Sequence, residues 1–458
     1  MGHTFKHANH LLFLALFGLV FFSLNPLIPR DALLPLYDSK RVLLIILVEL
    51  TALTLLFSSK ARLAIYKEWH SLSKLTRGVV SLFALSSLIA TLNATYPVSA
   101  VTQWLYLLGL VALLFLFKQE CRAQQLRILQ YFLWISVLLF LSVALVFWFR
   151  LSHLLVVDKH AIWGFANARF LNQIHVWLLI PTAYLLIARL QRSQSTLLLR
   201  FLLIADFAVI VATDARGPAI AIIVGFLLMS YLDAPRRKIW WTLLWQSALL
   251  GILFKLFLLE PIPSYLLGIG ADWHTLRTDS SGRVALWLEA LSMTTFWGLG
   301  GNAFVCDSAV FGRPHNSVLN IWVHWGIVST ICFCFLACMV LFRVFKTNNL
   351  RTRMLGVNLL VGLAYSLVSG VLDSPLSQLM AVLCLGMFWG RLIPKANEIR
   401  GHFRLLSAAT IILSLATLVA MNYRLYERLD AYPAFRPEAK IKTQFWLGHN
   451  CLEKPWSG

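Results

Sequence analysis

The sequence has little charge, and very little of it is negative. Charged residues make up 13% of the 458 positions, with 40 Lys and Arg against 20 Asp and Glu, whereas 59% of the residues are hydrophobic. Mean hydropathy is +0.74. A soluble chain of this length could not hide so much apolar surface. The scarcity of charge therefore excludes a soluble globular protein and predicts a polytopic membrane protein.

Metal and nucleotide motifs are also missing. No CxxC or His/Cys spacing suggests a metal site, and no outer loop carries a close carboxylate pair of the kind that holds a divalent cation. No Walker motif occurs, so the chain does not drive itself with ATP. We therefore expect no metal and no cofactor. Of the seven cysteines, Cys306 and Cys451 would share one side of the membrane, and a disulfide between them is left open.

Apolar runs of spanning length recur along the whole chain. They predict an all-α polytopic membrane protein with about 12–13 transmembrane helices. The first run follows a basic stub and lacks a small-residue cleavage site, as expected for a retained signal-anchor. No internal repeat or low-complexity linker interrupts the chain, so residues 1–458 are predicted to form a single membrane domain. The runs cover 11–29, 41–57, 78–94, 101–117, 128–149, 175–190, 199–213, 218–233, 239–259, 317–342, 354–371, 375–393 and 405–421.

Lys and Arg gather in alternate loops, which is the positive-inside pattern with a cytoplasmic N-terminus. The net charge of +20 is therefore a topological signal and not a sign of nucleic-acid binding. Outside the membrane we expect 150–174, 214–217, a large periplasmic loop at 260–316 that carries interfacial helices, and the tail 422–458. An even number of helices would place that tail inside. The basic loops are 58–77, 118–127, 189–200, 234–238, 343–353 and 391–404.

The large outer loop holds the densest set of reactive residues. Cations and an imidazole beside a bilayer indicate a reaction or transport site, and this loop supplies Arg283, Arg313 and His315, the last followed by Asn316. Arg283 is expected in the first turn of an interfacial helix from Gly282 to about Thr295, on which Trp287 also lies. The Gly-rich stretch 298–302 would form a flexible loop whose N–H groups suit an anion.

Two other outer segments join that loop. Residues 164–175 precede a predicted helix and contain Arg169, Asn172 and Gln173; an interfacial loop that solvates lipid headgroups is the simpler interpretation. Arg216 lies in the short segment 214–218, which could equally be a plain turn with a snorkelling Arg.

His315 can accept a proton near neutral pH, although a lone His is often a structural residue. Arg matches phosphate groups with two parallel hydrogen bonds. Chemistry built on Arg and His without a metal suits anionic leaving groups, of which phosphate and pyrophosphate esters are the obvious candidates.

At these residues the sequence resembles the bacterial O-antigen ligase, O-antigen polymerase and protein O-oligosaccharyltransferase superfamily. Asn167–Gln173 and Ser369–Gln378 look most like the short pilin-type O-oligosaccharyltransferases. Many family members have an acidic residue before the glycine that follows their HN motif, where this chain has Trp325; a group that orients the His would have to come from elsewhere. The superfamily resemblance is carried by Arg216-Gly217, Arg283 with Trp287, Gly298-Leu299-Gly300 with Phe304, and His315-Asn316-Ser317-Val318-Leu319 followed by Trp325-Gly326.

The resemblance implies a glycosyltransferase of the bacterial inner membrane. It would move a glycan from undecaprenyl pyrophosphate to a Ser or Thr hydroxyl of a protein acceptor such as pilin on the periplasmic face, without a metal and with inversion. In this interpretation His315 is the catalytic base, and Arg283 and Arg216 are catalytic residues that hold the pyrophosphate. The substrate-binding residues would be Arg169, Asn172, Gln173, Arg313, Asn316 and Trp287.

Three alternatives stay open. The acceptor could be lipid A–core, as in an O-antigen ligase, or another glycan, as in an O-antigen polymerase. In a different class, a flippase or other transporter of lipid-linked glycans should place its charges near the midplane in broken helices, whereas this chain puts nearly all of them at one face. The sequence identifies neither the glycan nor the oligomeric state.

Overall fold

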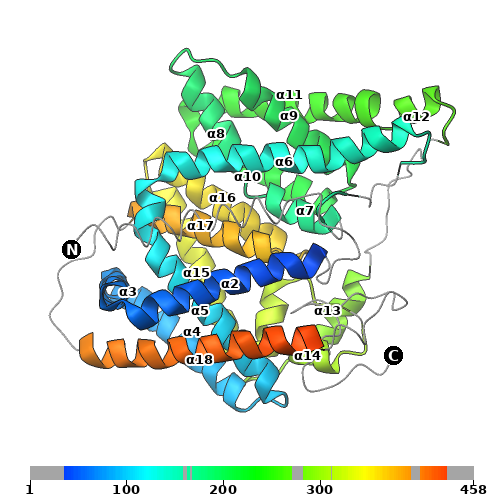
Figure 1. Ribbon diagram of the computed structural model, residues 1–458. Helices are drawn as coiled ribbons and strands as arrows, with labels where there is room; N and C mark the ends of the chain where they lie inside the picture. Colours follow the sequence, from blue (N-terminus) through cyan, green and yellow to red (C-terminus); the bar gives the residue numbers. More distant parts are fainter. Residues whose placement is uncertain are drawn as a thin grey trace.

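The structure, a computed structural model, describes residues 36–157, 162–165, 168–270, 282–310, 312–392 and 403–430. Every regular element in these ranges is a helix (Figure 1). By length and composition, eight helices of the described part can cross a membrane, and nine if the bent pair α2–α3 counts as one span. The prediction of an all-α polytopic membrane protein is confirmed.

Each predicted apolar run from residue 41 onward coincides with a helix, and the run at 11–29 lies outside the described residues. The long helices are α2 (Leu36–Phe57), α4 (Lys74–Leu92), α5 (Pro97–Ala123), α6 (Gln125–Ser152), α11 (Arg237–Phe254), α15 (Ser317–Lys346), α17 (Pro375–Leu392) and α18 (Phe403–Asp430). Shorter ones are α3 (Ser59–Ser71), α8 (Leu179–Leu190), α9 (Leu197–Ala212), α10 (Arg216–Leu232) and α16 (Leu350–Ser366). The shortest are α7 (Ala168–His175), α12 (Ile262–Leu266), α13 (Arg283–Ser292) and α14 (Ala303–Asp307).

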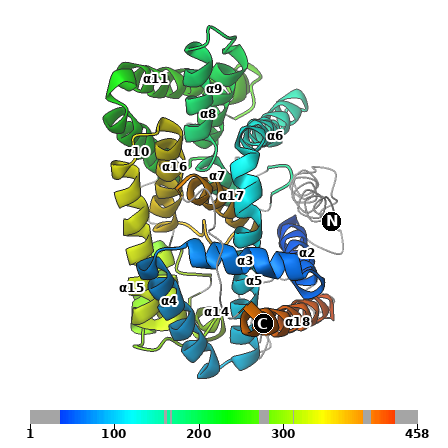
Figure 2. The same ribbon diagram turned by 90° about the vertical axis from the view of Figure 1, so that its left-hand side faces the viewer.

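Helix α3 lies in a segment expected to be a basic loop. It turns 102° away from α2 and crosses the bundle in Figure 2. Arg62 makes the corner by donating from Nη1 to the carbonyls of Leu55 and Leu56, at 2.6 and 2.9 Å, which satisfies acceptors that the end of α2 leaves open. Glu68 of α3 pairs with buried Lys118 of α5, so the charges of this segment fix a helix against the bundle.

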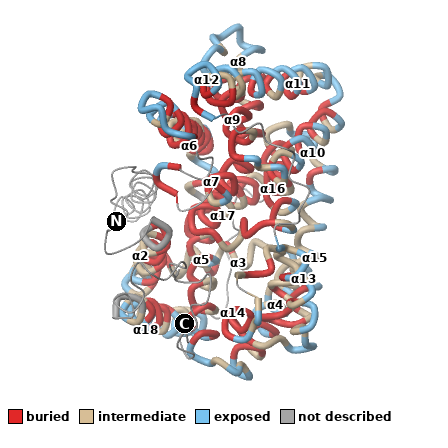
Figure 3. Tube along the Cα trace, turned by 90° about the vertical axis from the view of Figure 1, so that its right-hand side faces the viewer, coloured by how far each residue is buried: buried red, intermediate tan, exposed pale blue. Residues whose placement is uncertain are grey.

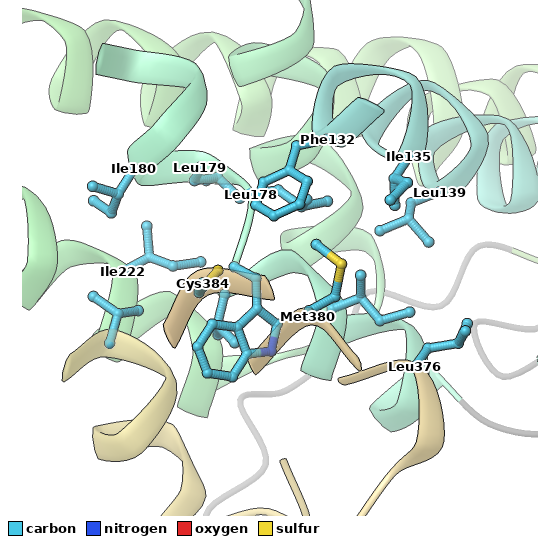
Figure 4. Close-up of a cluster of buried hydrophobic side chains, with 14 of the residues drawn as sticks. Phe132, Ile135, Leu139, Leu178, Leu179, Ile180, Ile222, Leu376, Met380 and Cys384 are labelled. Carbon is cyan, nitrogen blue, oxygen red and sulfur yellow. The ribbon is translucent and has the colours of Figure 1, made fainter. Parts of the chain in front are cut away.

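The core packs side chains from α6, α8, α10 and α17, together with the turn between α7 and α8 (Figure 4). Buried residues concentrate along α5, α7, α16 and α17, and exposed ones along the outer helices such as α11 (Figure 3). Many exposed side chains are large and apolar, among them Phe257, at 57%, as expected where lipid replaces water. The core residues labelled in Figure 4 are Phe132, Ile135, Leu139, Leu178, Leu179, Ile180, Ile222, Leu376, Met380 and Cys384.

A kink at Gly326 lets the outer loop enter the bundle. Gly326 has φ 75° and ψ 177° within α15, which leaves backbone groups of that helix free to pair with residues 296–300. Leu299 N–H donates to Val323 O at 2.8 Å, and Ile327 N–H donates to Phe296 O at 3.1 Å. The helix that follows His315 is therefore fastened to the loop that follows α13.

We expect Gly326→Ala to destabilise the protein. The conformation is nearly restricted to glycine and costs another residue about 1–3 kcal/mol, and a Cβ would lie 2.7 Å from Trp297 O and closer still to Phe296 O. Gly78→Ala is the matched control, since a Cβ there meets nothing within 4 Å. Thermal unfolding of the purified proteins measures the difference; equal unfolding temperatures would contradict this role of the kink.

The structure extends the last predicted helix and leaves the pairing of Cys306 with Cys451 open. Helix α18 continues to Asp430, so it extends past the predicted end at 421 into the segment expected to be a tail. Cys306 is disulfide-bonded. Cys451, with which the sequence left a disulfide open, lies outside the described residues, so that pairing stays open.

Candidate active site

Four helix N-termini carry the predicted cationic and imidazole side chains. Arg169 lies in the first turn of α7, Arg216 begins α10, Arg283 begins α13 as predicted, and His315 lies just before α15. The first N–H groups of a helix have no partner within it and bear partial positive charge. Side chains and helix ends therefore contribute charge of the same sign.

The structure brings these side chains together. The guanidinium of Arg283 interacts electrostatically with Arg169, Arg216 and the Tyr365 hydroxyl. Burial lowers the pKa of Arg283, and the two neighbouring arginines lower it further. Among the described residues Arg283 has neither a hydrogen-bond acceptor nor a carboxylate partner, and its Nε is buried. A half-buried cation among other cations is costly unless a charge of opposite sign pairs with it, so this cluster favours the binding of an anion.

His315 is held as a neutral imidazole beside these cations. Burial and the charges of Arg169, Arg283 and Arg313 lower its pKa to about 4. Its backbone has φ 51°, a left-handed conformation that is uncommon for a residue with a side chain and is more often found at functional sites. At neutral pH the ring can therefore take up a proton.

Asp373 is the acidic residue that sequence reasoning missed. The position that a Cβ would occupy on Gly370 lies 3.5 Å from Asp373 Oδ2, 3.6 Å from His315 Nδ1 and 3.6 Å from Gln173 Nε2. The carboxylate thus shares one small space with the imidazole. It supplies a candidate for the orienting group that Trp325 cannot provide; Trp325 packs edge-on against Phe83, with ring centroids 5.7 Å apart.

The turn that carries Asp373 is fixed from several helices. Asn320 Nδ2 donates to Asp373 Oδ1 at 3.4 Å. Buried Arg41 of α2 donates to the Asp373 carbonyl and, at 2.8 Å, to Gln378 Oε1, which also accepts from Tyr106 at 2.6 Å. Helices α2, α5, α15 and α17 therefore hold one turn beside His315.

Residues 168–175 form helix α7, so the alternative of an interfacial loop does not hold for them. The segment is buried from Leu171 onward because α7 packs against α10 and α17. Gln173 Nε2 donates to Ser369 Oγ at 3.0 Å, and its buried Oε1 accepts no hydrogen bond from any described residue. Asn172 lies inside the fold, where Nδ2 donates to Thr213 Oγ1 at 2.9 Å. Gln173 is thus near His315, whereas Asn172 joins α7 to α9.

Of the remaining predicted substrate-binding residues, Arg313 and Asn316 lie next to His315 in the sequence and have structural roles. Arg313 is buried and donates from Nη2 to Asn302 Oδ1 at 2.7 Å. Asn316 caps α15, and its Oδ1 accepts from the backbones of Val318 and Leu319 at 3.0 and 3.2 Å. Trp287 is half-buried on α13 with no hydrogen-bond partner for Nε1. Their contact with a substrate stays a prediction.

The glycine-rich loop does not offer its first N–H groups to an anion, contrary to the sequence-based expectation. Gly298 N–H donates to Thr295 Oγ1 at 2.9 Å. Gly300 N–H donates to His324 O at 2.9 Å, and Leu299 N–H also bonds to α15. These groups fasten the loop to the kinked helix, which is the physical reason that the expectation fails.

The pH dependence of catalysis should follow the lowered pKa of His315. The neutral form is the base, so we expect kcat/KM to be flat near neutral pH and to fall as pH drops through about 4. In Arg169→Gln the acid limb should move to higher pH, because a cation that lowers the pKa is gone. The pH–rate profiles of wild type and Arg169→Gln measure these limbs. A wild-type kcat/KM that falls already around pH 6.5, the ordinary pKa of His, would contradict this account.

The comparisons with known proteins point to one family. Residues 201–334 match the family model described as O-antigen ligase. This segment runs from α9 into α15 and contains Arg216, Arg283 and His315. The searches of curated proteins and of solved structures gave no match.

Proposed function

We propose that this membrane protein, which matches the O-antigen ligase family model over residues 201–334, is a glycosyltransferase that transfers a glycan from undecaprenyl pyrophosphate to a Ser or Thr hydroxyl. The proposed acceptor is a pilin-like protein, and the proposed location is the periplasmic face of the bacterial inner membrane.

One observation carries the proposal: Arg283, uncompensated by any described carboxylate, lies among Arg169 and Arg216 beside the neutral His315. A pyrophosphate is the kind of anion that this arrangement suits, since guanidinium groups pair with its oxygens bidentately. The converging helix N-termini add to the same attraction.

These residues suggest a single displacement. The neutral His315 takes the proton of the acceptor hydroxyl as its oxygen attacks the anomeric carbon of the glycan. The bond between that carbon and the pyrophosphate oxygen breaks, and undecaprenyl pyrophosphate leaves with its charge stabilised by Arg216 and Arg283. Asp373 orients the ring and stabilises the imidazolium that forms. Attack from the opposite face inverts the anomeric centre.

The charge distribution and Cys306 support the periplasmic side. The basic loops lie at the other ends of the helices, as the positive-inside rule requires for cytoplasmic segments. Cys306, on the same outer loop as Arg283, is disulfide-bonded, and disulfides persist in oxidising compartments such as the periplasm.

A contact between the two pilin-type sequence matches favours a protein acceptor. Gln173 of the first match donates to Ser369 of the second, and both lie beside His315 through Gly370. An O-antigen ligase or polymerase would use the same donor chemistry with lipid A–core or a glycan as acceptor. A flippase is less well supported, since the cations gather at helix ends and not in broken helices at the midplane.

The test offers purified enzyme a glycan on undecaprenyl pyrophosphate, with pilin and lipid A–core side by side and EDTA present. Glycosylated pilin alone is expected, and its formation in EDTA would support independence from metal. Glycosylated lipid A–core alone would replace the protein acceptor with that of a ligase. Product on neither would leave the polymerase and the flippase.

A further inference from the structure

A cavity rich in arginine lies at the end of the bundle away from the candidate active site. It consists of two adjoining hollows of about 380 and 620 Å³, and Arg351 and Arg391 line both. Helix α17 begins next to Asp373 and ends at this cavity, so its 18 residues separate the two places by about 27 Å. The C-terminal ends of α5 and α8 and the N-terminal ends of α6 and α16 form the other walls.

Every charged residue in the described lining of the cavity is an arginine. Arg122, Arg127 and Arg236 join Arg351 and Arg391, and no carboxylate or lysine of the described chain lines either hollow. Arg236 is paired with Asp233, with Nε 2.8 Å from Oδ2. Arg127, Arg351 and Arg391 have no such carboxylate partner among the described residues. Arg351 and Arg122 interact electrostatically with Arg391, so like charges are held close together.

Neutral groups hold the two shared arginines in place without neutralising them. Arg391 donates from Nε to Thr352 Oγ1 at 2.9 Å and from Nη2 to Asn349 Oδ1 at 3.0 Å. Arg351 donates from Nε to the Tyr184 hydroxyl at 3.1 Å. Within the described residues neither has a carboxylate partner. Fixed guanidinium groups in a concave space differ from the mobile snorkelling side chains that a topological charge excess alone would give.

We propose that this cavity binds a phosphate-bearing anion at the cytoplasmic end of the helix bundle. Arginine alone, without lysine, suits the planar, bidentate recognition of phosphate oxygens. Each hollow is many times larger than the roughly 30 Å³ of a water molecule. The ligand is a phospholipid headgroup or a soluble phosphate compound. The position among helix ends is typical of headgroup sites between transmembrane helices.

The test measures binding to the purified full-length protein by native mass spectrometry, with cardiolipin as the lipid probe and inorganic pyrophosphate as the soluble probe. The double variant Arg127→Gln/Arg351→Gln removes two cavity charges. The control variant Arg192→Gln/Arg200→Gln removes two exposed charges, one between α8 and α9 and one on α9, and neither residue lines the cavity. We expect the cavity variant to bind at least about tenfold more weakly and the control variant to bind like wild type.

The two probes separate the sources of the phosphate. Cavity-dependent binding of cardiolipin alone assigns a lipid headgroup, and cavity-dependent binding of pyrophosphate assigns a soluble ligand. Equal affinity of the cavity variant and wild type for both probes, or equal weakening in the control variant, would overturn the proposal. If loss of the Tyr184 contact unfolds the double variant, the single variant Arg127→Gln provides the same comparison. The Arg127 side chain is exposed and makes no hydrogen bond with any described residue.

Discussion

Replacing Arg283 with alanine is expected to abolish glycan transfer while the protein still accumulates and inserts. The guanidinium donates no hydrogen bond to any described residue, so its removal breaks none within the fold. What is lost is charge stabilisation of the leaving pyrophosphate, and one such donor in an active site contributes about 10²–10³-fold in rate. Transfer to the acceptor, measured with equal amounts of membrane-inserted protein, tests this.

Two further variants make the Arg283 result specific. Arg283→Lys keeps the charge but loses the bidentate geometry, so its rate should lie between those of wild type and Arg283→Ala. Arg192→Ala, exposed on another loop, should transfer at the wild-type rate. Undiminished transfer by Arg283→Ala would remove this residue from the donor site.

His315→Ala should lower kcat far more than it lowers donor affinity. A general base contributes about 10²–10⁴-fold, whereas the neutral imidazole attracts the pyrophosphate only weakly. Removing a ring whose pKa is already held down by Arg169 and Arg283 leaves those cations free to bind the donor. Single-turnover kinetics together with direct measurement of donor binding separate the two quantities.

The opposite pattern for His315 is equally informative. An equal loss of donor affinity and turnover would make His315 a phosphate ligand and leave the base to another group. Asn316→Ala serves as the companion variant, because it removes the cap of α15 next to the imidazole without removing the ring. A fall in turnover in both variants would show that the position of the ring matters as well as its basicity.

Hydrophobic run length predicted most of the fold because membrane helices have to satisfy their own backbone hydrogen bonds. It failed where helices are not apolar throughout. Helix α3 is polar and charged, and its Glu68–Lys118 pair is visible only once α5 is packed beside it. Helix α7 contains Arg169 and Asn172, so its composition predicted a loop, although tertiary contacts bury it.

The candidate site was predicted as a set of residue types but not as a constellation. Arg216, Arg283 and His315 stood out because charge beside a bilayer is costly. Asp373 lies within the Ser369–Gln378 match, yet no local pattern indicates that it lies near His315, because α15 and α16 separate the two residues along the chain. The glycine loop failed for a related reason: only the kink at Gly326 shows which carbonyls accept its N–H groups.

The central claim is that one cluster of arginines and a neutral imidazole transfers a glycan from a lipid pyrophosphate. The most direct measurement follows a labelled undecaprenyl-pyrophosphate glycan with purified wild type, Arg283→Ala and His315→Ala, in the presence of the acceptors. We predict that wild type consumes the donor and labels an acceptor, while both variants leave the donor intact. Equal consumption by the variants, or none by wild type with any acceptor, would contradict the account.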